Sequence, residues 1–388
     1  MKLTSCCAAI AALLAAGAFG AAQNEAAKYD PAMMVKDAIV TNGVKWIDGQ
    51  KLPIEGREFD DVTAYYDRLP GSLTTNVNAG VRGMRHHTSG MMFRFKTDSK
   101  SLSFQWKPTS KKLEMDHMPA SGVSGIDVYR WDEPRGAWLY VKTGRIYDWR
   151  MGKLEMDWKP GDKCLVNLPL YNGIEFFKLG IDPEATVEYA GIRSSGVSKP
   201  VVIYGTSITH GGCASRPGLG FVNIVGRRLD VPVTGLGFSG SGVMEYELSD
   251  VIARIDASCY VLDCLWNMDS DPVKKGPRSV ERNYEPFIRN LRAKRPDVPI
   301  IMAGACDVFC GIGKHSPGLR AEEAFTKALY EKLVSEGWKN LWYLPSEGML
   351  GDDFEGTVDG VHPNDIGMAR MGEAYAAAVA KALGLKMK

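Results

Sequence analysis

The pattern of apolar and polar positions divides the chain into two halves. Between residues 38 and 195, short segments alternate apolar and polar side chains, as in FRFKT (93–97), LSFQW (102–106) and GIDVYRW (125–131), and turn-forming residues separate them. Alternation with a period of two is typical of strands that bury one face. This half therefore predicts an all-β accessory domain, a sandwich of the jelly-roll kind.

The pattern changes after the polar stretch RSSGVSKP (193–200), which is typical of a linker. Segments of helix length, such as 321–337, now alternate with continuous apolar runs. These runs lie at residues 201–205, 231–238, 259–264, 299–304 and 340–345. Uninterrupted apolar strands that alternate with helices indicate a parallel sheet covered on both faces. We therefore predict a three-layer α/β domain with a five-stranded parallel sheet over residues 199–388.

The first twenty residues have the pattern of an export signal. Lys2 precedes a small, apolar stretch over residues 6–19, and the small residues at 20–22 suit cleavage by signal peptidase. The stretch is too short to span a membrane, and no other segment reaches about 18 uninterrupted apolar residues. We expect a protein that is exported, to the periplasm or out of the cell, and that has no membrane span.

Charge and cysteine content narrow the function classes. The 388 residues include 47 basic and 46 acidic side chains, a net charge of +1, which offers no electrostatic footprint for nucleic acid or an anionic membrane. The six cysteines beyond the signal are too sparse for a disulfide scaffold, so we expect buried free thiols. Cys306 and Cys310 can pair with each other or with Cys213.

Groups that suit acyl transfer follow four of the predicted strands. Ser207 comes two residues after the first apolar run, and the GFSGSG segment with Gly240 follows the second. Asn267 follows the third run, and DGVHPND (359–365) follows the fifth. The carboxyl ends of parallel strands meet at one edge of the sheet, so we expect these groups to lie together. They provide a nucleophile, a base, a carboxylate to orient the base, and donors for an oxyanion.

These segments resemble the motifs of the SGNH hydrolases, also called GDSL esterases. GTSIT, GFSG, LWNM and DGVHP occur in the family's order between residues 203 and 363. The resemblance implies a flavodoxin-like fold and a serine esterase with Ser207 as nucleophile, His362 as base and Asp359 as its orienting carboxylate. It also implies an oxyanion hole made by the N–H groups of Ser207 and Gly240 and the side chain of Asn267. No cofactor is implied, and we expect no metal site.

The GIDVY segment (125–129) is similar to the G-x-D-[LV]-Y motif of a subgroup in which a β-sandwich precedes the hydrolase domain. We expect its Asp127 and Tyr129 to be structural. Two positions depart from the family pattern, because Thr206 stands where many members have Asp, and WNM (266–268) replaces Gly-x-Asn-Asp. Neither change removes a reacting group, so both bear on the shape of the substrate.

The substrate is less constrained than the chemistry. An exported esterase with an aromatic-rich accessory domain suggests a small acyl ester, with O-acetylated carbohydrate as the favoured substrate. The same triad also suits an acyltransferase, and the fold suits a non-catalytic carbohydrate-binding protein. The sequence does not indicate an oligomeric state.

Five side chains are candidates for substrate contact. The methionine-containing segment 112–129 precedes a strand, and on a sandwich beside the hydrolase domain it is placed to reach the site. We expect His210 to be a loop or rim residue rather than the base, because the Asp-x-x-His motif has its own imidazole and carboxylate. The candidate contacts are Met115, Asp116, His117, His210 and Trp266.

Overall fold

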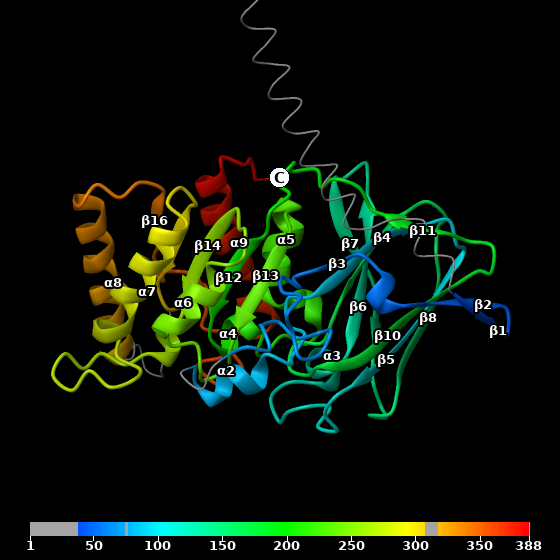
Figure 1. The fold of residues 1–388 in the computed structure, drawn as a ribbon, viewed down its shortest axis with the longest axis horizontal. Helices are drawn as coiled ribbons and strands as arrows, with labels where there is room; N and C mark the ends of the chain where they lie inside the picture. The colour runs from blue at the N-terminus through cyan, green and yellow to red at the C-terminus, as the bar shows by residue number, and fades with distance from the viewer. Residues whose placement is uncertain (1–37, 74–76, 307–316, 388) are drawn as a thin grey trace, which may run out of the picture.

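The computed structural model describes residues 38–73, 77–306 and 317–387. It consists of an antiparallel β-sandwich beside an α/β unit with a parallel sheet (Figure 1). Within these ranges no helix has the length and apolar character needed to cross a membrane. The predicted export signal and Cys310 lie outside the described residues.

The sandwich is built from two antiparallel sheets, as the alternating pattern predicts. One has the order β1 (Ile39–Thr41), β2 (Val44–Asp48), β10 (Ile174–Ile181), β5 (Ser101–Pro108) and β8 (Gly152–Asp157). The other has the order β11 (Val187–Tyr189), β4 (Met92–Thr97), β9 (Lys163–Asn167), β6 (Ile126–Asp132) and β7 (Ala137–Gly144), and β3 (Ile54–Glu55) pairs with β4. Along β5, Leu102, Phe104 and Trp106 are buried in the sandwich core, and the residues between them are partly exposed. The period of two is therefore confirmed.

The α/β unit contains the predicted five-stranded parallel sheet. Its order is β13 (Val233–Gly237), β12 (Val201–Gly205), β14 (Cys259–Asp263), β15 (Ile300–Ala303) and β16 (Leu341–Leu344). All four strand pairings are parallel, and each strand lies within one of the predicted apolar runs. Of these five strands, β12 comes first in the chain and lies between the second, β13, and the third, β14. This is the flavodoxin-like order.

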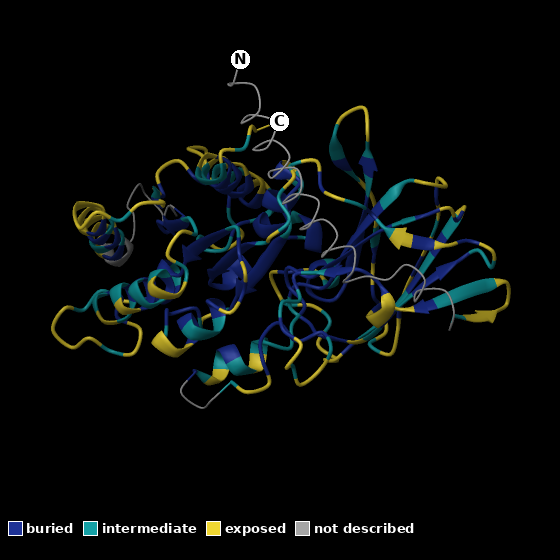
Figure 2. Cartoon of the chain, turned by 45° about the horizontal axis from the view of Figure 1, so that its top comes forward, coloured by how far each residue is buried: buried dark blue, intermediate teal, exposed yellow. Residues whose placement is uncertain are grey.

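Helices cover both faces of this sheet (Figure 1). Residues of α5 (Phe221–Leu229) and α9 (Asp365–Leu383) share one buried cluster with Ile203 and Val261. Residues of α6 (Tyr246–Ile252), α7 (Val280–Lys294) and α8 (Pro317–Ser335) share another with Tyr204 and Leu262. Figure 2 shows the sheet as a buried layer between helices whose outer sides are exposed. The three-layer α/β architecture is therefore confirmed.

The segment between β3 and β4 contributes to both cores, because Tyr66 and Met91 are buried in the sandwich while several other side chains pack on the α/β unit. Its Phe59, Leu69 and Val81 are buried among the apolar side chains that cover the parallel sheet. The segment includes a short helix, α2 (Ala79–Met84). Arg68 is buried and donates from Nη1 to the carbonyl oxygens of Gly235 (3.1 Å) and Gly237 (2.9 Å) on β13. A segment within the predicted accessory domain thus packs against β13, the edge strand of the parallel sheet.

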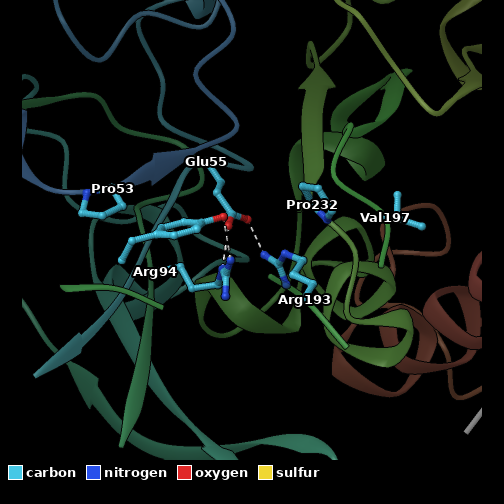
Figure 3. A pocket seen from close by; sticks show the side chains of 7 residues that line it. Pro53, Glu55, Arg94, Arg193, Val197 and Pro232 are labelled. Carbon is cyan, nitrogen blue, oxygen red and sulfur yellow. Dashed lines mark hydrogen bonds and ion pairs between the residues drawn. The ribbon is translucent and has the colours of Figure 1, made fainter. Parts of the chain in front are cut away.

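The polar stretch 193–200, which we expected to act as a linker, is docked at its first residue. Arg193 is buried and pairs with Glu55 and with Asp230 (3.0 Å), and Glu55 also pairs with Arg94 (2.7 Å; Figure 3). Burial alone would raise the pKa of Glu55, but the two guanidinium groups lower it, so the carboxylate stays ionised. Pro53, Val197 and Pro232 line the same small cavity. The linker is therefore anchored at this end, because Arg193 meets two carboxylates.

Asp127 of the GIDVY segment joins the two units. It is 0% exposed, and its Oδ2 accepts hydrogen bonds from Arg216 Nη1 (2.7 Å) and the Gly218 N–H (2.9 Å). Its Oδ1 accepts from Asn167 Nδ2 (2.8 Å) within the sandwich. Tyr129 also accepts from Arg216. The motif therefore binds the chain just beyond Ser207, which agrees with the structural role expected for Asp127 and Tyr129.

Four described cysteines are buried free thiols, as expected: Cys164, Cys213, Cys259 and Cys264. Cys213 therefore does not pair with Cys306.

Candidate active site

Ser207 stands at the first turn of a short helix that follows the first parallel strand. Strand β12 ends at Gly205, and helix α4 (Ser207–His210) begins with Thr206 as its N-cap, whose hydroxyl accepts from the Ile208 N–H (3.2 Å). A Cβ on Gly205 would collide with the Thr209 hydroxyl and the carbonyl oxygen of Asp263, so this sharp turn needs glycine. Thr206 thus performs the capping function at the position where the family pattern has Asp. Ser207 is 7% exposed.

Ser207, His362 and Asp359 form a continuous hydrogen-bonded chain. Ser207 Oγ lies 3.0 Å from His362 Nε2, and His362 Nδ1 lies 2.7 Å from Asp359 Oδ2. Asp359 Oδ1 accepts from the N–H groups of Val361 (2.9 Å) and His362 (2.7 Å). Partial burial would raise the pKa of Asp359, but the hydrogen bonds from His362 and Val361 lower it to about 2. The ionised carboxylate keeps the proton on Nδ1, so the Nε2 lone pair faces Ser207.

The loop that presents His362 is fixed to the start of α9 and to the loop after Ser207. Asn364 is the N-cap of α9 and accepts from the N–H groups of Ile366 (3.0 Å) and Gly367 (3.1 Å). Asp365 accepts from the N–H (2.8 Å) and hydroxyl (2.6 Å) of Ser215. These bonds fix the two loops relative to each other. The Ser207 hydroxyl is therefore held against the His362 imidazole.

The candidate oxyanion donors flank Ser207 because β13 and β14 flank β12. Asn267 ends the short helix η4 (Leu265–Asn267) after β14, and its Oδ1 accepts from the Gly242 N–H (3.3 Å). With its oxygen held in this way, the amide nitrogen is the half of the side chain left to donate. Gly240 follows β13 with a φ of +65°, and its backbone is exposed. Gly242 also approaches the carbonyl of Gly205 too closely for a side chain.

Tyr171, from the sandwich, contacts the backbone of the nucleophile Ser207. Its hydroxyl donates to the carbonyl oxygen of Ser207 (2.9 Å), and its ring stacks on His210 at 4.1 Å between centroids. Sequence reasoning missed this residue. It lies 36 positions from Ser207, in the connection between β9 and β10, and no local pattern marks it.

His210 does not lie at the rim, so that expectation is wrong. It is 0% exposed, and its Nε2 lies 3.1 Å from His87 Nδ1 beneath the Tyr171 ring. Burial lowers the pKa of His87 to about 3 and that of His210 well below its usual value, so both imidazoles are neutral. A ring enclosed in this way contacts neither substrate nor the Ser207 hydroxyl. His210 packs beneath the site because Tyr171 covers it.

The segment expected to reach the site from the sandwich does lie against it. Met115 and Met118 exchange backbone hydrogen bonds (2.9 and 3.1 Å), which leaves Asp116 and His117 at an exposed tip. The His117 ring lies 5.7 Å from the His362 ring. Trp266 is partly buried, and its Nε1 donates to the carbonyl oxygen of Cys306 (3.3 Å). His117 thus lies beside His362, and contact of Met115, Asp116, His117 and Trp266 with substrate stays a prediction.

One group of side chains around the site has the composition of metal ligands. His117, Cys213 and His362 each offer an atom within 4.8 Å of the other two. We expected no metal site because no histidine has a partner at recognisable spacing in the sequence. The fold instead brings together three residues from distant segments.

Two family models match the chain. Residues 198–380 match the GDSL-like lipase/acylhydrolase family, and residues 44–187 match the N-terminus of SGNH hydrolase-type esterases, named GxDLY. No curated protein matches the sequence.

Solved structures of similar fold cover most of this chain. A GDSL-like lipase from Bacteroides ovatus is 26% identical, with a TM-score of 0.76 over 89% of this chain and 99% of its own. A salicylyl-acyltransferase from a tetracycline biosynthetic pathway is 20% identical, with a TM-score of 0.68 over 88% and 98%. A family two carbohydrate esterase from Clostridium thermocellum, in complex with cellohexaose, is 13% identical, with a TM-score of 0.54 over 76% and 93%. The last two likenesses show the fold alone. The chain therefore belongs to the GDSL-like lipase/acylhydrolase family of carboxylic ester hydrolases, in the SGNH group with a GxDLY N-terminal region.

Proposed function

We propose that this protein is an exported serine esterase that removes short acyl groups, above all O-acetyl groups, from carbohydrate. One observation carries the proposed chemistry: Ser207 Oγ, His362 and Asp359 are linked by hydrogen bonds of 3.0 and 2.7 Å. In this order the carboxylate orients the imidazole and the imidazole faces the hydroxyl, as nucleophilic catalysis requires.

The proposed reaction passes through an acyl-enzyme. Ser207 Oγ attacks the acyl carbon while His362 Nε2 takes its proton, and Asp359 stabilises the imidazolium that forms. The N–H groups of Ser207 and Gly240 and the Asn267 amide stabilise the oxyanion of the tetrahedral intermediate. Collapse of the intermediate breaks the ester C–O bond, and the leaving alkoxide takes the proton from His362. Water then attacks the acyl-enzyme by the same route and releases the acid and free Ser207.

The carbohydrate part of the proposal is supported by the residues beside the triad and by the solved structures of similar fold. His117 presents an exposed imidazole next to His362, and Asp116 is exposed at the same tip, which suits recognition of sugar hydroxyls. One similar structure is a carbohydrate esterase with a bound cello-oligosaccharide. Trp131, Trp138 and Trp158 are buried, so they form no stacking surface for a sugar, whereas Tyr140 is exposed and Trp149 is partly exposed. We assign recognition to the loops beside the triad, because they lie next to the reacting groups.

Acyl transfer is the second candidate, because one similar structure is an acyltransferase with the same two-part architecture. The triad would act in the same way, and an acceptor alcohol would replace water in the second step. Export rests on the signal pattern of residues 1–20. A non-catalytic carbohydrate-binding role is disfavoured because the hydrogen-bonded chain from Ser207 to Asp359 is complete.

Replacement of the nucleophile tests the proposal. Ser207→Ala should lower the release of acetate from acetylated xylan and of nitrophenol from p-nitrophenyl acetate by several orders of magnitude, because a triad acts as a unit. It should also abolish labelling by an organophosphonate. The matched control is Ser335→Ala, which alters an exposed hydroxyl at the end of α8 and should leave both rates unchanged.

The proposal fails if Ser207→Ala keeps more than about a tenth of the wild-type rate, because loss of a nucleophile costs far more than that. Product analysis with a carbohydrate alcohol added to the reaction separates the two candidates. Acetate as the main product supports the hydrolase, and a newly acetylated alcohol as the main product supports the transferase.

A further inference from the structure

Three side chains from separate parts of the fold meet at the catalytic histidine. His117 lies at the tip of segment 112–129 of the sandwich, Cys213 follows helix α4, and His362 lies before α9. One ligand atom of each lies within 4.8 Å of the others. His117 is exposed and Cys213 is buried, so the group extends from the surface inward to the thiol.

Backbone contacts fix the positions of all three residues. The Cys213 N–H donates to the carbonyl oxygen of Pro363 (2.9 Å), which holds the thiol segment against the residue that follows His362. The Met115–Met118 bridge shapes the tip that presents His117. Ser121 Oγ donates to the carbonyl oxygen of Ser215 (2.7 Å), which docks the sandwich segment on the loop that carries Cys213. The backbone that carries the three ligands is therefore held in place, and their donor atoms must close from within 4.8 Å of one another onto one ion.

The donor set selects the kind of metal. One sulfur and two imidazole nitrogens suit Zn²⁺, which is commonly bound by three protein ligands with water in the fourth position. Ca²⁺ and Mg²⁺ prefer several oxygen ligands, which this group lacks. His362 also resembles a zinc ligand in its second hydrogen bond, because Asp359 Oδ2 lies 2.7 Å from Nδ1 and leaves Nε2 as the nitrogen that can bind a metal.

We propose that His117, Cys213 and His362 form a Zn²⁺ site whose occupation inhibits the esterase. His362 Nε2 lies 3.0 Å from Ser207 Oγ, so a metal on Nε2 occupies the lone pair that would accept the serine proton. Zinc then acts as a reversible inhibitor and not as a cofactor. The inhibition rests on the proposed function, because it requires His362 to be the base, whereas the binding does not.

Zinc binding is measured on the full chain after removal of metals with EDTA. We use Ser207→Ala as the parent, since it keeps all three ligands and has no turnover, and titrate it with Zn²⁺ by calorimetry. We expect one Zn²⁺ per chain, and no saturable binding of Ca²⁺ or Mg²⁺. Adding Cys213→Ser or His117→Ala should weaken binding by at least about tenfold, since loss of a ligand costs at least as much as loss of an outer-shell partner. Cys164→Ser, which removes a buried thiol from the sandwich, is the matched control and should bind as the parent does.

Inhibition is measured on p-nitrophenyl acetate with otherwise wild-type protein. Zn²⁺ should inhibit and EDTA should restore the rate, whereas Cys213→Ser should keep the metal-free rate and need at least about tenfold more Zn²⁺ for half inhibition. Equal zinc affinity in the parent, the Cys213→Ser and the His117→Ala proteins would overturn the site. His117→Ala changes an exposed tip, so it decides the matter even if Cys213→Ser fails to fold.

The two proposals fail in different ways. Zinc binding that depends on Cys213, in a protein whose wild type lacks esterase activity, would refute the proposed function and keep the site. Esterase activity that depends on Ser207 and is indifferent to Zn²⁺ would refute the inhibitory site and keep the proposed function.

Discussion

Replacement of Asp127 by Ala tests whether the GIDVY motif acts as the joint between the two units. The change removes the acceptor for three donors, namely Arg216 Nη1, the Gly218 N–H and Asn167 Nδ2. It touches neither Ser207 nor the residues that contact it, so the expected effect is on stability and on the coupling between the units.

The structure sets the size of this effect. Asn167 is fully buried and Gly218 is buried, so each loses a hydrogen bond that water cannot replace, at about 1–3 kcal/mol per group. The Arg216 side chain is 19% exposed, so water recovers part of its loss. We expect the free energy of unfolding to fall by about 3–5 kcal/mol, the range for a broken buried ion pair.

The assay is urea unfolding followed by tryptophan fluorescence. Trp131 and Trp138 are buried in the cluster that links the sandwich to α5, so they report separation of the units. The matched control is Asp132→Ala on the same strand, whose partner Arg135 has a side chain that is 69% exposed, and which should cost no more than about 1 kcal/mol. The reasoning is refuted if Asp127→Ala costs no more than this control.

Three further outcomes are expected. Asn267→Ala should lower kcat by about 10²–10³ with a smaller change in KM, because an oxyanion donor acts mainly in the transition state, and a change confined to KM would contradict that role. Tyr171→Phe removes the hydroxyl that donates to the Ser207 carbonyl oxygen, which still accepts a hydrogen bond from the Gly212 N–H (3.0 Å). The free energy of unfolding should therefore fall by about 1 kcal/mol, and kcat by no more than about tenfold. Full retention of both would show that the contact is neutral. Burial raises the pKa of Asp263 from 3.8 to about 7, so the folded protein binds a proton that the unfolded chain releases, and stability should fall as pH rises between these values. Urea unfolding of Asp263→Asn at pH 5 and pH 8 should show a smaller fall than wild type, and an equal fall would contradict the assigned pKa.

The local pattern was sufficient for the architecture. Each parallel strand lies within a continuous apolar run, because a strand covered by helices on both faces has no polar side. The sandwich strands alternate, because each sheet buries one face, as β5 shows most clearly. The short helix α2 and the packing of Phe59, Leu69 and Val81 on the α/β core were not predicted, since these few apolar side chains show no period.

The positions of the chemical groups could also be predicted, because they depend on strand ends and not on side-chain packing. Ser207 and Asn267 follow neighbouring strands of one parallel sheet, so the topology alone brings them to one edge. Asp359 and His362 are three residues apart, so a single turn suffices to pair them.

Other features were decided by the tertiary structure alone. His210 is only three residues from Ser207, yet it is enclosed because Tyr171 from the sandwich stacks on it. His117 and Cys213 meet at His362 because the sandwich docks on the loop after α4. The sequence by itself determined the alternating strands of the sandwich, the five parallel strands and the groups at their ends, because these depend on side-chain period and chain direction. Packing between the two units decided what surrounds those groups, because contacts between distant segments depend on shape and on buried polar pairs that leave no periodic trace in the chain.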